Sequence, residues 1–377
     1  MEHDKAPDAK GQPIAILHDY ITQYGGAETV LEALHAIWPS APIYTTFYDS
    51  GAMTKIGLRI PPSSIHALLP TWLPHQRALG KLWTPVYPLL FRRLDLRRYR
   101  TIISSSSFAA HQAPTPKGAR HICYSHTPPR FLYGLTTEID HARLRRRFPP
   151  IALLYRLLRH LDQDGAARVS MFVANSEEVR RRIRVIYGRE AEVIYPPVDT
   201  RAFATIPLSV GGDYFLTWGR LVASKRVDII IQAANKTGQK LIVAGSGADE
   251  LRLRRMAGAN VTFVGRPDTA TLLGLLAQAR AVLFAAEEDF GLVPVEAMAA
   301  GKPVLAYGAG GALESVIAGV TGEFFAPQTA EALQTILENF DEERYDPARC
   351  RAQAQRFDRT IFAQRIAQVV ALVNDTP

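Results

Sequence analysis

The chain has 377 residues, 47% of them hydrophobic, which is enough to fill two cores, since a single core rarely grows past about 250–300 residues. Its two cysteines, Cys123 and Cys350, provide neither a disulfide framework nor the ligand spacing of a metal site. With a polar start and no apolar run of about 18 residues, neither a signal peptide nor a membrane-spanning helix is expected, so a cytoplasmic protein is favoured.

The formal net charge of +8 is unevenly distributed. Residues 1–200 hold 26 Lys and Arg against 17 Asp and Glu, a net charge of +9, whereas the remainder holds 18 against 19, a net charge of −1. Such asymmetry predicts an anionic partner surface, either acidic lipid or nucleic acid. A nucleic-acid-binding protein is disfavoured, because the sequence shows no helix-turn-helix, zinc spacing or aromatic-studded sheet.

The first predicted strand covers residues 14–18, an unbroken apolar run of the kind that a parallel sheet buries on both faces. Gly25 and Gly26 follow it and open a helix, where paired glycines allow a backbone to approach a phosphate closely. The segment lacks the three spaced glycines of the dinucleotide fingerprint, so a nicotinamide cofactor is not expected.

A second strand is predicted over residues 42–47, and residues 61–100 are then rich in proline, aromatic residues and arginine. Two interpretations are open for the segment from Trp83 to Arg100. It can lie in a membrane interface, with the rings among the headgroups and the arginines on anionic lipid, or form an amphipathic helix on the sheet. Pro85 and Pro88 argue against a long regular helix.

Further strands are predicted over residues 101–104 and 120–124. His126 follows the second of these, at the carboxyl edge of the sheet, where open α/β sheets place their ligands. It is the histidine favoured for a site, whereas His18, His111 and His121 are interpreted as structural. Residues 171–175 predict a strand that precedes a helix capped by Ser176, and the prolines at 196 and 197 indicate a domain boundary.

The second half restarts with a strand at residues 214–218, followed by Gly219 and Arg220, with Lys225 one turn beyond. Two cations at one strand edge can hold a diphosphate. Arg226 is the alternative to Lys225 for this role. Strands over 240–244 and 261–264 continue the alternation of strands and helices and predict a second doubly wound sheet.

The segment from Glu288 to Glu296 connects a strand at 281–285 to a helix that ends at Gly301. Gly291 and Leu292 therefore lie where a helix begins, and its free N–H groups and positive dipole end favour an anion. Two carboxylates beside an anion site suit a phosphorylated ligand rich in hydroxyls, such as a sugar nucleotide.

These motifs resemble the signature of glycosyltransferase family 4, whose members are retaining enzymes of the GT-B fold. The resemblance rests on Glu288, Phe290, Gly291, Leu292 and Glu296 with the run Glu-Ala-Met-Ala-Ala-Gly-Lys-Pro-Val that follows, and on the Gly-Arg-Leu…Lys motif at 219–225. The strings Tyr-Ser-His-Thr-Pro-Pro-Arg at 124–130 and Gly-Gly-Ala-Glu at 25–28 are similar to O-antigen and exopolysaccharide mannosyltransferases.

The resemblance implies an α/β, GT-B architecture of two Rossmann-like domains, residues 1–197 for the acceptor and 198–357 for the donor. A helix at 358–377 is expected to return to the first domain. It implies transfer of mannose from GDP-mannose, or a sugar from a UDP-sugar, to a lipid-linked saccharide, without a metal or other cofactor, at the inner face of the cell membrane. Catalytic roles fall on His126, Arg220, Lys225 and Glu288. Donor contacts fall on Gly25, Gly26, Gly219, Arg220, Lys225, Gly265, Arg266, Phe290, Gly291, Leu292 and Glu296.

Overall fold

The computed structural model describes residues 13–22, 24–49, 51, 57–70, 84–135, 149–208 and 212–375. Internal contacts divide the chain into two compact units. Unit 1 comprises Met1–Pro197 and Phe362–Pro377, and unit 2 comprises Val198–Ile361. The division after Pro197 falls at the proline pair named above. Each unit is an α/β domain with one parallel sheet, as the sequence predicted.

The sheet of unit 1 has seven parallel strands in the order β3-β2-β1-β4-β5-β6-β7. The inner strand β1 (Ile14–His18) is completely buried, which fits its largely apolar sequence. The others are β2 (Ile43–Thr45), β3 (Ile65–Ala67), β4 (Thr101–Ser106), β5 (Arg120–Ser125), β6 (Met171–Ala174) and β7 (Ala191–Val193).

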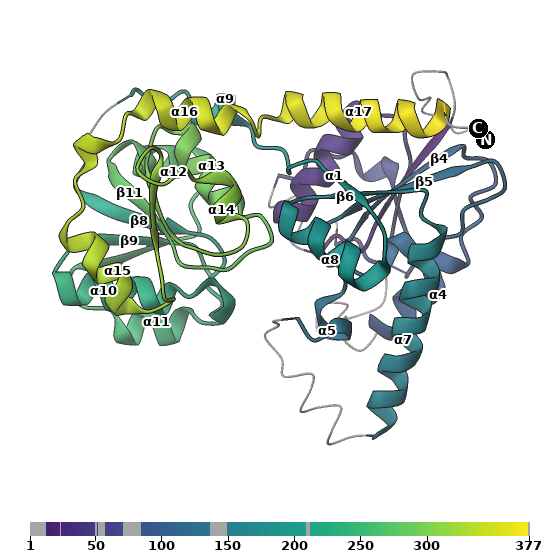
Figure 1. Ribbon diagram of the computed structural model, residues 1–377, viewed down its shortest axis with the longest axis horizontal. Helices are drawn as coiled ribbons and strands as arrows, with labels where there is room; N and C mark the ends of the chain where they lie inside the picture. The colour runs from purple at the N-terminus through teal and green to yellow at the C-terminus, as the bar shows by residue number, and fades with distance from the viewer. Residues whose placement is uncertain are drawn as a thin grey trace. The chain divides into compact units, whose positions relative to one another are not determined.

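Helices cover both faces of this sheet (Figure 1). Because side chains alternate along a strand, Ile14 and Ile16 enter one core whereas Ala15 and Leu17 enter the other. The helices are α1 (Gly26–Ile37), α4 (Tyr87–Arg92), α5 (Arg130–Tyr133), α7 (Pro149–Arg168) and α8 (Glu177–Tyr187). Short 3₁₀ helices are η1 (Pro62–Ser64), η2 (Thr84–Val86) and η3 (Ala110–Gln112).

The C-terminal helix α17 (Arg359–Asp375) completes the core that contains Ile14 and Ile16, although the helix is far from these two residues in sequence (Figure 1). Its buried face packs with β1 and α1 in one apolar cluster. At its far end Asn374 hydrogen-bonds to Thr101, the first residue of β4. The buried residues of this helix are Phe362, Ile366, Val369, Val370 and Val373.

The sheet of unit 2 has six parallel strands in the order β10-β9-β8-β11-β12-β13. Helices α10, α11 and α15 lie on one side of it in Figure 1, and α9, α13 and α16 on the other. The strands are β8 (Tyr214–Trp218), β9 (Leu241–Ala244), β10 (Val261–Gly265), β11 (Ala279–Phe284), β12 (Val304–Tyr307) and β13 (Gly322–Phe325). The helices are α9 (Thr200–Phe203), α10 (Val227–Thr237), α11 (Glu250–Met256), α12 (Thr269–Ala277), α13 (Leu292–Ala299), α14 (Ala312–Ser315), α15 (Ala330–Glu338) and α16 (Pro347–Gln355), with 3₁₀ helices η4 (Ala223–Lys225) and η5 (Glu342–Arg344).

The aromatic and arginine-rich segment belongs in part to the core of unit 1. Tyr87 and Phe91 are 5% and 0% exposed and pack with Leu17 and Phe47. The interpretation that placed these rings in a membrane headgroup layer is therefore wrong for the two of them, because they cover the sheet. Pro88 occupies the first turn of α4, where its missing N–H costs nothing, and the helix is only six residues long. Trp72 and Trp83 lie outside the described residues.

Three arginines of this segment, at positions 92, 97 and 98, have partners within unit 1. Arg92 contacts Asp164 at 2.6 Å and the Leu161 carbonyl at 2.7 Å. Arg97 pairs with Asp95, and Arg98 donates to the Tyr44 hydroxyl at 2.9 Å. Within the described part of the chain, no helix combines the length and the apolarity that a bilayer crossing requires.

Candidate functional site

The candidate site of unit 2 lies where the strand order of its sheet reverses. Strands β8 and β11 are neighbours, but the chain proceeds from β8 outward to β10 before it returns to β11. Ligands of open α/β sheets bind at the carboxyl ends of strands at such a switch point. Gly219 and Arg220 follow β8 and Glu288 follows β11, so the topology brings the two predicted motifs to one sheet edge.

The turn into α13 requires glycine at Gly291. Its φ of 84° is one that other residues rarely adopt, and a Cβ there would lie 3.0 Å from the Phe284 ring. Gly291 is the residue before the helix, so the free amides of the first turn begin at Leu292, as predicted. The ring of Phe290 is buried against Phe357, which leaves only the backbone of Phe290 for a ligand.

The loop after β12 holds this turn from the other side. The Gly311 amide donates to the Glu288 carbonyl at 2.9 Å. A Cβ on Gly310 would lie 2.3 Å from the same carbonyl oxygen, and one on Gly311 would lie 2.2 Å from the Phe290 Cα. Two glycines are therefore needed for the backbones to approach, and the turn that presents Glu288 is built from two loops.

Lys225 and Glu288, which the sequence assigned separately, form an ion pair at this edge. Lys225 ends the short helix η4 after β8, and both side chains are about a quarter exposed. Arg226 points elsewhere: it pairs with Asp228 at 3.2 Å and donates to Gln328 at 3.0 Å. Of the two candidate cations, Lys225 is thus the one that lies against a carboxylate of the α13 turn.

Glu296 lies on the second turn of α13 and accepts a hydrogen bond from the Trp218 indole at 3.3 Å. Burial raises its pKa to about 7, the Trp218 donor opposes this rise, and the charge of Glu288 adds to it. The sequence did not single out Trp218. Its position at the end of β8 could have indicated a site residue, because the last residue of a strand at the switch point faces the ligand crevice.

Backbone contacts join the loops after β8, β9 and β10. The Gly245 amide donates to the Gly265 carbonyl, and a Cβ on Gly245 would lie 1.9 Å from the Gly219 carbonyl oxygen. Gly219 and Gly265 have φ values of 139° and 70°. The predicted residues Arg220 and Arg266 are both exposed on these loops. Arg220 and Arg266 thus add two cations to the carboxyl edge of the unit 2 sheet.

In unit 1, His126 follows β5 and belongs to a chain of polar side chains at the sheet edge. Its Nε2 lies 2.8 Å from the Ser105 hydroxyl, which lies 3.1 Å from Nδ1 of His18. Nε2 of His18 is 4.0 Å from the Glu28 carboxylate. Glu28 is in the first turn of α1, behind the predicted glycines Gly25 and Gly26. The interpretation of His18 as structural missed this connection, because sequence alone does not show which strand ends are neighbours.

Helix α7 anchors the segment that follows His126. Asp162 accepts from the Tyr133 hydroxyl at 2.6 Å, and Arg159 donates to the Leu132 carbonyl at 2.5 Å. The close approach of α7 to η3 requires Gly165, since a Cβ there would lie 2.9 Å from the Gln112 Cα. This glycine costs about 1 kcal/mol in a helix interior, which the packing of α7 offsets.

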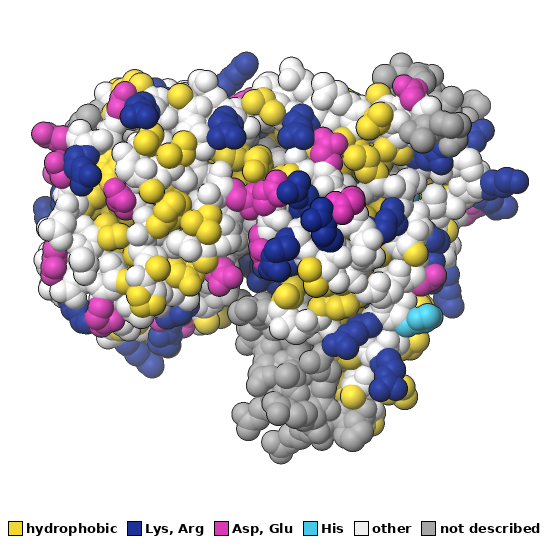
Figure 2. All heavy atoms as spheres, in the orientation of Figure 1, with side chains coloured by type: hydrophobic (Ala, Val, Ile, Leu, Met, Phe, Trp, Pro, Cys, Tyr) yellow, Lys and Arg dark blue, Asp and Glu magenta, His cyan; other side chains and the backbone are white. Residues whose placement is uncertain are grey.

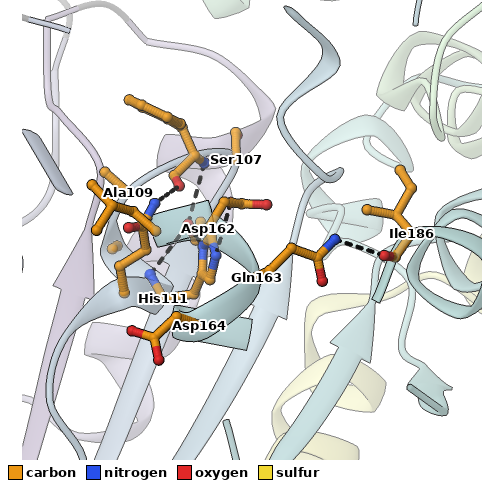
Figure 3. A network of polar contacts seen from close by, with 12 residues as sticks. Ser107, Ala109, His111, Asp162, Gln163, Asp164 and Ile186 are labelled. Atoms are coloured by element: carbon orange, nitrogen blue, oxygen red, sulfur yellow. Dashed lines mark hydrogen bonds and ion pairs between the residues drawn. The ribbon is translucent and has the colours of Figure 1, made fainter. Parts of the chain in front are cut away.

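Asp162, Gln163 and Asp164 form an Asp-x-Asp triplet, the motif that metal-dependent transferases of another fold use. The expectation that the chain lacks this motif, which had supported metal independence, is therefore wrong. Figure 3 shows Asp162 beside His111, whereas Gln163 points to Ile186. Asp164 pairs with Arg168 and Arg92, which hold its pKa below the usual value. Both carboxylates thus have protein partners. Among the described residues no group of three His, Cys, Asp or Glu side chains is arranged to hold a metal.

Both halves of the chain match family models of transferases. Residues 24–202 match the model Glycosyltransferase Family 4, and residues 199–357 match Glycosyl transferases group 1. A curated glycogen synthase from Mycobacterium tuberculosis (strain CDC 1551 / Oshkosh) is 36% identical over 168 residues, 41% of this chain and 40% of that protein. A D-inositol 3-phosphate glycosyltransferase from Mycobacterium bovis (strain BCG / Pasteur 1173P2) is 30% identical over 209 residues, 47% and 42% of the two chains. The matches thus span less than half of these curated relatives.

Solved structures share the fold over nearly the whole chain. Anabaena Alr3699/HepE in complex with UDP and glucose has a TM-score of 0.69 at 22% identity and covers 96% of this chain and 99% of its own. Sucrose-phosphate synthase from Thermosynechococcus elongatus has a TM-score of 0.64 at 19% identity, with 96% and 99% covered. The two parallel-sheet domains therefore have the GT-B fold, as expected.

Proposed function

We propose that this chain, whose two domains are of the GT-B glycosyltransferase type of family 4, transfers a sugar from a nucleoside diphosphate to a hydroxyl with retention. One observation carries the proposal: the ion pair of Lys225 and Glu288 lies at the start of α13, at the switch point of the sheet. A cation, free helix amides and a carboxylate are there together, and a sugar diphosphate offers the phosphates and hydroxyls that suit them.

In this proposal the diphosphate is bound by Lys225, Arg220 and the first amides of α13. These donors stabilise the charge that grows on the leaving diphosphate, and a comparable preorganised donor contributes about 3 kcal/mol. Glu288 then exchanges its contact with Lys225 for hydroxyls of the transferred sugar, and Glu296 accepts from the ribose hydroxyls. The reaction needs no metal ion, because the protein's own cations supply the positive charge.

GDP-mannose is the proposed donor, on the resemblance of residues 124–130 to mannosyltransferases, and a lipid-linked saccharide is the proposed acceptor. A UDP-sugar is the alternative donor, because Gly265 and Arg266, which the family resemblance places beside the nucleobase, do not by themselves distinguish guanine from uracil. The solved relative named with UDP and glucose is too distant in sequence to decide between them.

The test is a panel of GDP- and UDP-sugars, scored by release of nucleoside diphosphate with and without EDTA. We expect GDP-mannose to be turned over in EDTA. Lys225→Ala should lower turnover about 100-fold, as for other preorganised donors, while the matched variant Arg226→Ala should have a smaller effect because its partners are Asp228 and Gln328. Loss of activity in EDTA with rescue by magnesium or manganese contradicts metal independence. If no donor of the panel is turned over in the presence of a lipid-linked saccharide acceptor, the proposed glycosyltransferase function is contradicted.

A further inference from the structure

A single residue joins two helices beside the candidate site of unit 2. Helix η4 ends at Lys225 and α10 begins at Val227, so Arg226 is the C-cap of the first and the N-cap of the second. Its amide donates to the Ala223 carbonyl at 3.2 Å, and its carbonyl accepts from the Ile229 amide at 3.1 Å. The chain therefore changes direction within Arg226, and Lys225 leaves the backbone directly before this turn.

The backbone of Arg226 is left-handed. Its φ of 50° and ψ of 35° lie in the αL region, and among the described residues it is the one non-glycine residue with a positive φ. A residue with a Cβ is disfavoured there, because the Cβ comes too close to the following carbonyl oxygen. Such strain persists only where the surrounding structure fixes the backbone. The contacts of the Arg226 side chain identify that structure.

The Arg226 side chain links three segments of unit 2. It pairs with Asp228 in the first turn of α10 at 3.2 Å and donates to the Gln328 side chain at 3.0 Å. The Gln328 amide donates in turn to the Ala285 carbonyl at 2.8 Å. Gln328 follows β13, whereas Ala285 follows β11 and is 1% exposed. Arg226 is thus connected, through one glutamine, to the buried start of the loop that carries Glu288.

Two connections therefore join the same pair of segments. One is the ion pair of Lys225 with Glu288, whose side chains are both about a quarter exposed. The other runs from Arg226 through Gln328 to Ala285, three positions before Glu288. Because this second connection ends on buried backbone, it limits how far the two segments can move apart.

We propose that Arg226 is a positioning residue for Lys225. Its left-handed backbone turns the chain so that Lys225 points to the α13 turn, and its link to Ala285 through Gln328 maintains that direction. The guanidinium serves here as a structural link, and Asp228 compensates its charge. That Lys225 then meets a diphosphate rests on the proposed function, whereas the placement of Lys225 by Arg226 does not.

Two substitutions separate this role from direct binding of a phosphate by Arg226. Arg226→Lys keeps the positive charge, but its single amine cannot reproduce the two contacts that the planar guanidinium makes. Arg226→Gly loses the charge, but glycine adopts a positive φ as readily as a negative one. Calorimetric titration with GDP and with UDP compares the two variants.

We expect Arg226→Gly to bind the nucleotide more tightly than Arg226→Lys. Arg226→Ala, which has neither the side-chain link nor the freedom of glycine, should lose affinity by about tenfold, or about 1.4 kcal/mol. The opposite order, with Arg226→Lys the tighter binder, would mean that the charge matters and not the position, and it overturns the proposal.

A double-mutant cycle tests whether Arg226 acts through Lys225. When Lys225 is already alanine, Arg226→Ala should weaken nucleotide binding no further, because the two residues then act as a unit. The matched control is Arg280, which likewise pairs with a carboxylate, that of Glu342, and donates to a glutamine, Gln239. Arg280 lies near the start of β11, at the opposite edge of the sheet, so Arg280→Ala should leave nucleotide affinity unchanged in either background. Additive losses for Arg226 and Lys225 contradict the positioning role.

A measurement without ligand separates this inference from the proposed function. Trace acylation of lysine amines, read by mass spectrometry, reports on the ion pair, because only an uncharged amine reacts and a neighbouring carboxylate favours the charged form. Lys225 should be labelled several-fold faster in Arg226→Ala than in the wild type, with Lys236, which pairs with Glu331, as the unchanged reference. If labelling changes in this way but neither GDP nor UDP binds, the proposed function fails and the role of Arg226 stands. If a nucleotide binds and Lys225 is labelled equally in both proteins, this inference alone fails.

Discussion

Glu288 and Glu296 differ in surroundings although they flank the same turn. Glu288 is paired with Lys225, whereas Glu296 lies deeper, beside Trp218, with a pKa raised to about 7 chiefly by burial. A carboxylate that accepts from two ribose hydroxyls must be ionised, and protonation turns one of its oxygens into a donor. Nucleotide binding should therefore weaken as the pH falls through about 7, because the neutral form then dominates.

Calorimetric titration with nucleoside diphosphate between pH 8 and pH 5, limits chosen to span that value by about one to two units, checks this prediction. The nucleotide's own phosphate titrates in the same window, so the informative quantity is the difference between wild type and Glu296→Gln. The variant should lose affinity by about tenfold or more at pH 8 and show the smaller pH dependence, since hydrogen bonds to charged groups contribute about 1.5–3 kcal/mol each. Glu288→Ala should leave nucleotide affinity nearly unchanged and lower turnover. The opposite pattern would place the sugar beside Glu296.

Single residues were predictable where one local rule decides them. The positive φ at Gly301 and the cap by Ser176 follow from helix ends alone. The contact of Trp218 with Glu296 joins residues 78 positions apart, and that of Ser105 with His18 joins residues 87 apart. Such pairs depend on which strands are neighbours. The motif at 288–296 could therefore be found from the sequence, but its partners could not.

Elements were predictable when their apolar runs were long. The sequence predicts β1 with both ends correct, and β8 likewise. Strand β3 was missed because it has only three residues, Ile65–Ala67, one of them an exposed histidine, and lies at the sheet edge. The long helix α7 received no prediction of its own. Leu153 and Leu157 are 68% and 53% exposed, so the apolar residues of this helix are not confined to its buried face and give no clear amphipathic pattern.

Helix α17 should stabilise unit 1 although it follows unit 2 in sequence. Ile366 is 2% exposed in the cluster that contains β1 and α1, whereas Leu372 on the same helix is 61% exposed. Ile366→Ala removes buried methylene groups and leaves a cavity, which costs about 2–5 kcal/mol. Leu372→Ala should cost less than about 0.5 kcal/mol, as at other surface sites. Urea unfolding monitored in unit 1 checks both, and equal effects would mean that α17 contributes no core.

The basic excess of residues 1–200 is not spread evenly over the surface of unit 1. On the face shown in Figure 2, acidic side chains lie among the basic ones. Four arginines of α8 pair with glutamates: Arg180 with Glu177, Arg181 and Arg182 with Glu178, and Arg184 with Glu190. These three glutamates leave α8 with little uncompensated charge, so the basic excess of residues 1–200 is not concentrated there. The segment after α4 is a better candidate for an anionic surface.

We predict that unit 1 binds anionic membranes through Arg93, Arg98 and Arg100, which are exposed. Arg97 is left out because Asp95 compensates its charge. Arg92 is excluded because its contacts with Asp164 and the Leu161 carbonyl hold α4 against α7. Each basic residue near such a surface contributes about 1 kcal/mol, so replacing the three by Ser should weaken binding to vesicles rich in anionic lipid by about 100-fold.

Co-sedimentation at low ionic strength measures this effect. The control replaces Arg180, Arg181 and Arg184 by Ser, which changes the net charge equally but removes arginines whose charges are already compensated by Glu177, Glu178 and Glu190. If overall charge alone drives binding, both variants lose it equally, as the summed field requires. If the segment after α4 is the contact surface, the first variant loses far more than the second, and salt should abolish the difference because exposed charges are screened beyond about 10 Å at 0.1 M ionic strength. Equal binding by the wild type and the Arg93, Arg98 and Arg100 variant would assign these three residues to solvent.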